Sequence, residues 1–187
     1  MPGVPSSISP PADAPVPQPP AGAPGPGERT QGHQPACRGC ADVEGSLRIA
    51  SWVHDDGRSV LSRFAVGPEH QGAPGILHGG LLVAAFDESM GCAHSLFDLR
   101  AVTAHLETDF RAPVPVARDA WFTSRIDAIV GRKLYASSTA HLDEPEGPLV
   151  ATASALFLRV DDEHFLRHGR EEDLVAAGYL PPPDATG

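Results

Sequence analysis

The clearest hydrophobic pattern in the chain is an apolar run over residues 79–95. The run is apolar around most of a helical circumference and too long for a typical strand, so it predicts a buried helix. His78-Gly79-Gly80 directly precedes it and predicts a loop at the helix start. The first N–H groups of a helix have no partner within the helix, so this loop exposes backbone donors.

Six other segments have the alternating or continuous apolar pattern of strands. They are residues 47–53, 59–66, 102–111, 120–130, 134–142 and 149–160. Asp55-Asp56-Gly57 predicts a hairpin turn between the first two, and turns rich in Pro or Gly separate the later ones. Consecutive strands with short turns predict an antiparallel meander, across whose concave face the helix must lie. The pattern therefore predicts an α+β hotdog fold, with an antiparallel sheet of about six strands wrapped around a central helix.

Composition divides the chain into three parts. Residues 1–35 are crowded with Pro and Gly, so we expect a disordered or polyproline-like tail. Residues 36–160 supply enough chain for one domain with a single core. Residues 161–187 form an extension whose helix-like pattern over 161–177 ends at Gly178. We expect that extension to pack outside the core.

Charge and cysteine content narrow the possible partners and location. The formal net charge of −10 argues against nucleic-acid binding, which needs clustered Lys and Arg. No apolar run approaches the roughly twenty residues that span a bilayer, and no secretion signal is evident. Three cysteines are too few for a disulfide framework. The expectation is a cytoplasmic protein that binds neither nucleic acid nor membrane.

The helix start and one carboxylate in the helix predict an active site. The Gly79 N–H lies where the helix dipole adds roughly half a positive charge, so it can hold a developing oxyanion. Asp87 follows six apolar residues, a position where a carboxylate is costly unless it has a partner. We interpret Asp87 as a base or a nucleophile, and both roles stay open. Glu88 beside it better fits a solvated helix face.

The spacing of these two groups predicts an oligomer. About eight residues of helix separate Gly79 from Asp87 by about 12 Å along the axis, so one helix cannot bring both to one atom. If both act on one carbonyl, each site takes its donor from one chain and its carboxylate from another. This reasoning predicts a homodimer or a dimer of dimers.

A short cysteine motif precedes the first strand. Cys37-Arg38-Gly39-Cys40 has the spacing of half a zinc site, and His33 is close by in the sequence. No second pair follows at a suitable distance, so we expect no metal, no other cofactor and a structural role at the entrance to that strand. Cys92, within the apolar run, is expected to be a small core residue.

Several motifs resemble one known family. Pro74-Gly75-x-x-His78-Gly79-Gly80 followed by Asp87-Glu88, together with the order of elements, resembles the hotdog-fold acyl-CoA thioesterases of the PaaI-like branch, in the 4-hydroxybenzoyl-CoA thioesterase superfamily. Residues 103–106, 110–115 and 150–153 look like that family's third strand, proline turn and last strand. The resemblance implies hydrolysis of an acyl-CoA thioester to a free acid and CoA.

The resemblance also implies roles for individual residues. Gly79 would donate its N–H to the thioester carbonyl, His78 would shape the turn, and Asp87 would be the catalytic carboxylate. Thr103 matches a hydroxyl position that orients the attacking water. Some relatives carry Asn or Gln where this chain has Gly72, which leaves assistance to the leaving group unassigned.

Substrate-binding candidates follow from position. Arg111, Arg132 and Lys133 lie in strand loops, where relatives hold the CoA phosphates near basic residues. Gly80 and Glu88 complete the set of substrate-binding candidates. The acyl tail would run beside the helix, and the sequence leaves its length or aromatic character open.

Two alternative functions remain. A hotdog-fold enoyl-CoA hydratase or dehydratase would need a catalytic histidine paired with a carboxylate, and Pro74-Gly75-Ile76-Leu77 faintly suggests one. A non-catalytic acyl-CoA-binding or interaction module could use the Pro-rich tail as a docking segment. The sequence also leaves open dimer versus tetramer.

Overall fold

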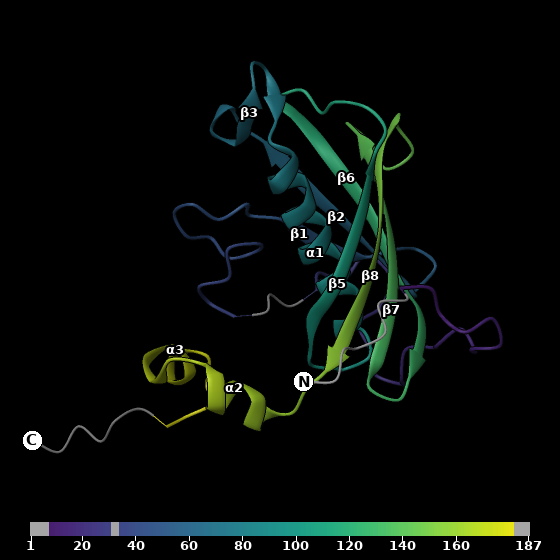
Figure 1. Ribbon diagram of the computed structural model, residues 1–187, viewed down its shortest axis with the longest axis vertical. Helices are drawn as coiled ribbons and strands as arrows, with labels where there is room; N and C mark the ends of the chain where they lie inside the picture. The colour runs from purple at the N-terminus through teal and green to yellow at the C-terminus, as the bar shows by residue number, and fades with distance from the viewer. Residues whose placement is uncertain (1–7, 31–33, 182–187) are drawn as a thin grey trace, which may run out of the picture.

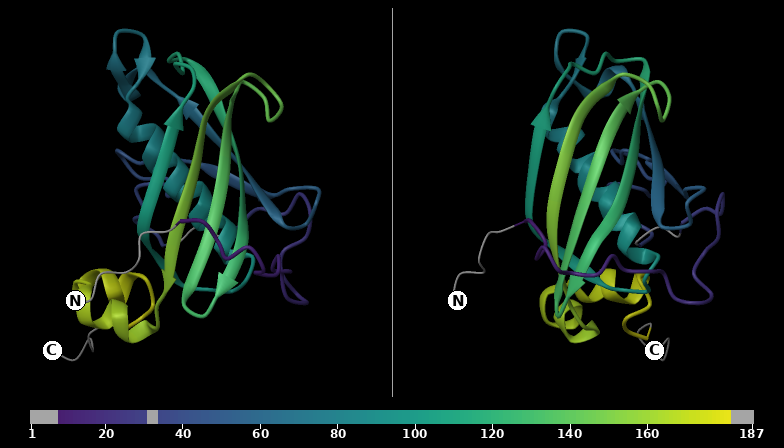
Figure 2. Two further views of the ribbon diagram at one scale, coloured as in Figure 1. Left: turned by 45° about the vertical axis from the view of Figure 1, so that its right-hand side comes forward. Right: turned by 90° about the vertical axis from the view of Figure 1, so that its right-hand side faces the viewer.

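The computed structural model describes residues 8–30 and 34–181. A six-stranded antiparallel sheet, in the order β1-β2-β6-β7-β8-β5, forms its centre. The strands are β1 (Ala50–Val53), β2 (Ser59–Val66), β6 (Arg118–Val130), β7 (Lys133–Leu142), β8 (Leu149–Arg159) and β5 (Ala101–Phe110). The sheet curves around helix α1 (Gly79–Ser95), as Figures 1 and 2 show. The predicted α+β hotdog fold is confirmed.

Helix α1 forms the centre of the hydrophobic core. Phe86 and Met90 are fully buried, and the edge of the Phe86 ring meets Phe122 of β6 at a centroid distance of 5.0 Å. Burial of such large apolar side chains contributes about 1.5–3 kcal/mol each relative to exposure. The apolar run therefore forms a helix that the sheet wraps, as its pattern predicts. No helix in the described part of the chain is long and apolar enough to cross a membrane.

A row of buried serine hydroxyls ties this helix to the sheet. Ser89 of α1 donates to Ser62 of β2 at 2.9 Å and lies 2.7 Å from the Ser124 hydroxyl of β6. The row continues from Ser124 to Ser138 of β7 at 2.7 Å, and from Ser62 to Ser51 of β1 at 2.8 Å. Satisfied buried networks of this kind favour one packing arrangement. The row therefore holds the rotation of α1 about its axis, which sets the directions of its carboxylates.

Two regions near the first strands differ from the sequence expectations. Strand β1 begins at Ala50 instead of residue 47, because Arg48 has φ 51°, which is incompatible with an extended strand. The segment before α1 contains a 3₁₀ turn (Pro68–His70) and two short strands, β3 (Gln71–Ala73) and β4 (Ile76–Leu77). The hydrophobic pattern predicts no strand there, since strands this short carry little periodic signal.

The C-terminal extension also differs in detail. The predicted helical segment consists of two short helices, α2 (Asp162–His168) and α3 (Glu171–Ala176). Gly169 and Arg170 between them have extended backbone angles, which end the first helix. Gly178, the expected stop, has φ 78°, a conformation typical of glycine after a helix. Figure 1 shows both helices beside one end of the sheet.

The two edges of the sheet differ in their backbone hydrogen bonding. At the β1 edge, the Val53 carbonyl accepts from the Gly27 N–H and the Val53 N–H donates to the Glu28 carbonyl, both at 2.9 Å. At the other edge, β5 pairs only with β8 among residues 8–30 and 34–181. An unpaired edge strand offers a row of backbone donors and acceptors to another chain.

The N-terminal segment contacts the sheet within its described part. Ile8 and Ala14 pack against a buried cluster of Ala128, Tyr135 and Leu156. Figure 2 shows this segment crossing the face of the sheet that is turned away from α1. The three-part division of the chain stays a prediction, and His33 lies outside the described residues.

Candidate active site

The start of α1 leaves one backbone donor available. His78 is the N-cap residue, and its Nδ1 accepts a hydrogen bond from the Gly80 N–H at 2.9 Å. The His78 carbonyl accepts from the Leu81 and Leu82 N–H groups. Within the described residues, the Gly79 N–H makes no hydrogen bond. The Gly79 N–H is therefore the backbone donor of this turn that is available to a ligand. His78 fixes the conformation of the turn.

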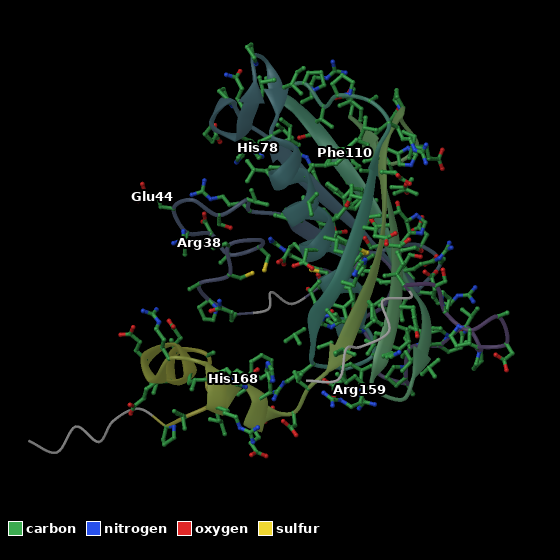
Figure 3. The ribbon with its side chains drawn as sticks, in the orientation of Figure 1. Arg38, Glu44, His78, Phe110, Arg159 and His168 are labelled. Atoms are coloured by element: carbon green, nitrogen blue, oxygen red, sulfur yellow. The ribbon has the colours of Figure 1, made fainter. Side chains whose placement is uncertain are left out.

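An apolar pocket lies beside this donor. Its volume is about 310 Å³, and its lining comprises Ile76, Leu77, Gly79, Leu82, Phe110, Arg111, Ala112, Pro113 and Val114. Phe110 ends β5 with 55% of its surface exposed, and a Cβ added at Gly79 would lie 3.5 Å from its ring. Figure 3 shows His78 and Phe110 toward the same end of the molecule. Sequence reasoning did not single out Phe110, because a strand-ending aromatic carries no functional signal of its own.

Asp87 is paired with a hydroxyl of the edge strand. The Thr103 hydroxyl donates to Asp87 Oδ1 at 2.6 Å, joining the middle of α1 to the start of β5. Asp87 is partly buried, whereas Thr103 is exposed. The β5–β8 register shifts between Thr103 and His105, as in a β-bulge. Bulges redirect side chains and are common next to active sites.

The donor and the carboxylate lie far apart within one chain. Gly79 is beside Phe110 at the end of β5, and Asp87 is beside Thr103 near its beginning. The helical rise separates the two residues by about 12 Å, as the sequence spacing indicates. Within a single chain, the two groups therefore lie toward opposite ends of the exposed β5 edge.

The expectation for Glu88 is wrong. Glu88 is 8% exposed, so it does not lie on a solvated face. Each helical residue turns the side-chain direction by about 100°, which sends Glu88 away from β5. Its carboxylate accepts hydrogen bonds from Cys37 Sγ at 3.4 Å and Cys92 Sγ at 3.7 Å. Glu88 is also absent from the lining of the Gly79 pocket.

The basic candidates divide between two ends of the sheet. Arg111 lines the Gly79 pocket and lies 3.4 Å from Asp109. Arg132 and Lys133 lie at the turn between β6 and β7, which adjoins the end of β8. Arg132 Nε donates to the Arg159 carbonyl at 3.2 Å, and both residues line a separate cavity of about 350 Å³. One chain therefore does not bring the three residues together.

Gly72 cannot carry the amide that some relatives have at this place. A Cβ there would lie 2.7 Å from His78 Cα, a contact that requires backbone movement. The neighbouring Gln71 uses its side-chain oxygen to accept from the Gly75 N–H at 2.6 Å. Both positions therefore shape the β3–β4 turn.

Comparison with known proteins shows what the chain is similar to. The family model of the thioesterase superfamily matches residues 74–149, which include Gly79, Asp87 and Thr103. This part of the chain is similar to the thioesterase superfamily. Acyl-coenzyme A thioesterase THEM4 of Bos taurus is 33% identical over 136 residues, covering 73% of this chain and 55% of that protein. THEM4 of Mus musculus is 35% identical over 107 residues, covering 57% of this chain and 45% of that protein.

The chain spans about half the length of these curated relatives. Among solved structures, the E. coli PaaI protein has a TM-score of 0.56 at 18% identity, over 62% of this chain and 81% of that one. A Streptococcus pneumoniae thioesterase protein with coenzyme A has a TM-score of 0.52 at 16% identity, over 55% and 79%. At these identities the structures support the hotdog fold alone.

Proposed function

We propose that this protein is an acyl-CoA thioesterase of the PaaI-like branch of the thioesterase superfamily. The observation that carries the proposal is the Asp87–Thr103 pair on the open β5 edge of a chain whose Gly79 N–H is unused beside an apolar pocket. A carboxylate, a hydroxyl and an oxyanion donor are the groups that thioester hydrolysis needs.

In the proposed reaction, the Gly79 N–H holds the thioester carbonyl oxygen as it gains negative charge. Thr103 orients a water molecule, and Asp87 takes its proton while the water oxygen bonds to the carbonyl carbon. The carbon–sulfur bond then breaks, and the proton passes to the departing CoA sulfur. Direct attack by Asp87, giving an anhydride that water hydrolyses, uses the same groups and yields the same products.

Pairing of two chains through β5 would complete the site. In an antiparallel pair of β5 strands, the Phe110 end of one chain lies beside the Thr103 end of its partner. Gly79 of one chain would then face Asp87 of the other, since Gly79 adjoins Phe110 and Asp87 adjoins Thr103. We therefore propose a homodimer, or a dimer of dimers, with two composite sites.

The same pairing gives the basic residues a role. It would bring the Arg132 and Lys133 end of one chain toward the Gly79 end of the other. We propose that these two residues and Arg111 bind the CoA phosphates. The Streptococcus pneumoniae protein holds coenzyme A, and a protein of Streptococcus mutans holds acetyl-CoA. Two further structures of the Streptococcus pneumoniae protein each have one residue replaced by alanine, a threonine in one and an aspartate in the other. These two residues are sixteen positions apart, which is also the separation of Asp87 and Thr103.

The pocket suits a small acyl group. Its volume of about 310 Å³ is at the lower end of the usual range for ligand sites. Leu82 lines it, whereas Phe86 and Met90 are 0% exposed and are not part of its lining. We propose short or single-ring acyl-CoA substrates. The three cysteines form no disulfide, which supports the proposed cytoplasmic location.

A thiol-release assay over short, medium, long and aryl acyl-CoA substrates tests the function. We expect release of CoA, and a loss of about 10²–10⁴-fold in kcat for Asp87→Asn. Asp98→Asn is the matched control, because Asp98 is exposed just after α1 with φ 50°, a conformation that Asn adopts readily. Binding of acyl-CoA without thiol release, or hydration of 2-enoyl-CoA without it, would refute the proposal.

A further inference from the structure

Three metal-ligating side chains meet behind α1, on the side away from the Asp87–Thr103 pair. The Cys37 and Cys40 sulfurs and a carboxylate oxygen of Glu88 all lie within 4.8 Å of one another. The cysteines come from the segment before β1, and Glu88 comes from the middle of α1, 51 residues after Cys37. Figure 3 shows the loop that carries Arg38 and Glu44 beside this helix.

The surroundings of Glu88 suit a metal ion. Glu88 is 8% exposed, and two thiols, those of Cys37 and Cys92, contact its carboxylate at 3.4 and 3.7 Å. A carboxylate and two cysteine sulfurs are groups that bind a metal ion in their anionic form, and a site of low exposure strengthens their attraction for a divalent cation.

The backbone around the cysteines has the form of a metal-binding turn. The Gly39 N–H donates to Cys37 Sγ at 3.4 Å, an interaction that stabilises a thiolate and orients it as a ligand. The turn also passes directly over the carboxylate, because a Cβ at Gly39 would lie 2.0 Å from Glu88 Oε2. A glycine at this position therefore lets both cysteines approach Glu88.

The turn is held in place by the segment that leads into β1. The Leu47 N–H donates to the Arg38 carbonyl at 2.8 Å, and the Ile49 N–H donates to the Gly39 carbonyl at 2.9 Å. The Arg38 guanidinium also hydrogen-bonds the Glu44 carbonyl. These contacts fix the loop independently of the cysteine side chains, so the three ligand atoms are brought together by the fold.

We propose that Cys37, Cys40 and Glu88 bind one zinc ion. Two thiolates and one carboxylate favour zinc, because magnesium and calcium prefer oxygen ligands throughout. Two sulfurs of a tetrahedral zinc site are about 3.8 Å apart, which small side-chain rotations can reach from the observed cluster. Each thiol releases its proton to solvent as its sulfur bonds the ion, and no electron is transferred.

The ion would join the segment before β1 to the middle of α1. Its ligand Glu88 is the next residue after Asp87, so the site is a structural clip behind the carboxylate of the proposed reaction. The sequence led to the opposite expectation because no second Cys or His pair follows Cys37 and Cys40. The fold supplies the third ligand instead, from an apolar helix in which Glu88 resembled a surface residue.

Metal analysis of the full chain tests this proposal. Protein purified from cells grown with zinc, under reducing conditions, should carry about one equivalent of zinc per chain after dialysis. Cys37→Ser, Cys40→Ser and Glu88→Gln should each lower the zinc content or affinity by about tenfold or more. X-ray absorption on the loaded protein should show two sulfur ligands, with nitrogen or oxygen completing the set.

Two control variants separate ligand loss from general damage. Glu44→Gln changes an exposed carboxylate of the same loop, and Cys92→Ala removes the cysteine that contacts Glu88 from within the helix. Both should keep the wild-type zinc content. Circular dichroism of each variant shows whether the fold is retained, and titration of chelator-treated wild-type protein with zinc gives the affinity without any variant. A wild-type zinc content no higher than that of Cys37→Ser would overturn the proposal. A disulfide between Cys37 and Cys40 in the reduced preparation would overturn it as well.

Discussion

Asp87 and Glu88 are neighbours in one helix, yet they lie in opposite chemical environments. Asp87 faces the open edge of the sheet and accepts a hydrogen bond from the Thr103 hydroxyl. Glu88 faces the loop before β1 and contacts thiols. The difference arises because one helical step turns the side chain by about 100°. The same functional group is thus suited to proton transfer on one face of α1 and to metal binding on the other.

The largest expected effect is the loss of activity when the Asp87 carboxylate is replaced. Asp87→Asn should lower kcat for acyl-CoA hydrolysis by about 10²–10⁴-fold, because the amide cannot accept the proton of water. Its zinc content and thermal midpoint should match the wild type. Thiol release measures the rate, and metal analysis of the same preparation measures the zinc content. A loss of zinc in this variant would show that the two faces of α1 do not act independently.

The reverse pattern is expected for Glu88→Gln. Loss of an ion present at about 100 times its Kd removes about 2.7 kcal/mol of stability, so the midpoint should fall by about 5–10 °C. Scanning calorimetry with and without added zinc measures this change, and Glu44→Gln serves as the matched control. If zinc raises the midpoint of Glu88→Gln as much as that of the wild type, Glu88 is not a ligand.

Variants of Thr103 test the role of its hydroxyl beside Asp87. Thr103→Ala should lower kcat by about tenfold or more, since the carboxylate loses its hydroxyl partner and the attacking water is no longer oriented. Thr103→Ser keeps the hydroxyl and should restore most of the rate. Steady-state kinetics of the two variants distinguish a role of the hydroxyl from a role of the strand backbone. Equal losses in both would assign the effect to packing.

A smaller effect is expected where the helix rotation is held. Ser89→Ala removes the central hydroxyl of the buried serine row and leaves the Ser62 and Ser124 hydroxyls with one partner fewer. The free energy of unfolding should fall by about 1–3 kcal/mol, as urea denaturation can measure. Ser95→Ala, near the end of the same helix, is the control, since the Ser95 hydroxyl donates to the Cys92 carbonyl of its own helix. A neutral Ser89→Ala would show that packing alone orients α1.

The sequence predicts the fold well because its main signals are local. The apolar run gives α1 as Gly79–Ser95, and the turns rich in Pro and Gly separate the strands close to their observed ends. Gly79 and Asp87 stand out for the same reason, as a loop glycine and a carboxylate in apolar surroundings. The direction of Glu88 was not predictable, since α1 is apolar around most of its circumference and shows no clear solvent face.

Other parts of the site depend on contacts between distant segments. Thr103 was a candidate only through resemblance, because a threonine in a strand needs no functional explanation. The register shift after Thr103 and the approach of Cys37 to Glu88 arise in the folded sheet, and no short sequence pattern records them. The exposure of the β5 edge likewise follows from strand order, which periodicity does not specify.

The proposed sharing of one site by two chains can be tested with Gly79→Pro. Gly79 is the first residue of α1, a position that favours proline, so the substitution removes the N–H and keeps the helix. A Cβ there meets the Phe110 ring at an ordinary 3.5 Å, and Gly79→Ala is the control that retains the donor. Gly79→Pro and Asp87→Asn should each be nearly inactive.

The decisive measurement is the hydrolysis rate after these two inactive variants are unfolded and refolded together in equal amounts. Half of randomly formed dimers would then contain one of each chain, with one of two sites intact, so about a quarter of the wild-type rate should return. Each variant refolded alone should stay inactive. A mixture no more active than its components would contradict the shared site.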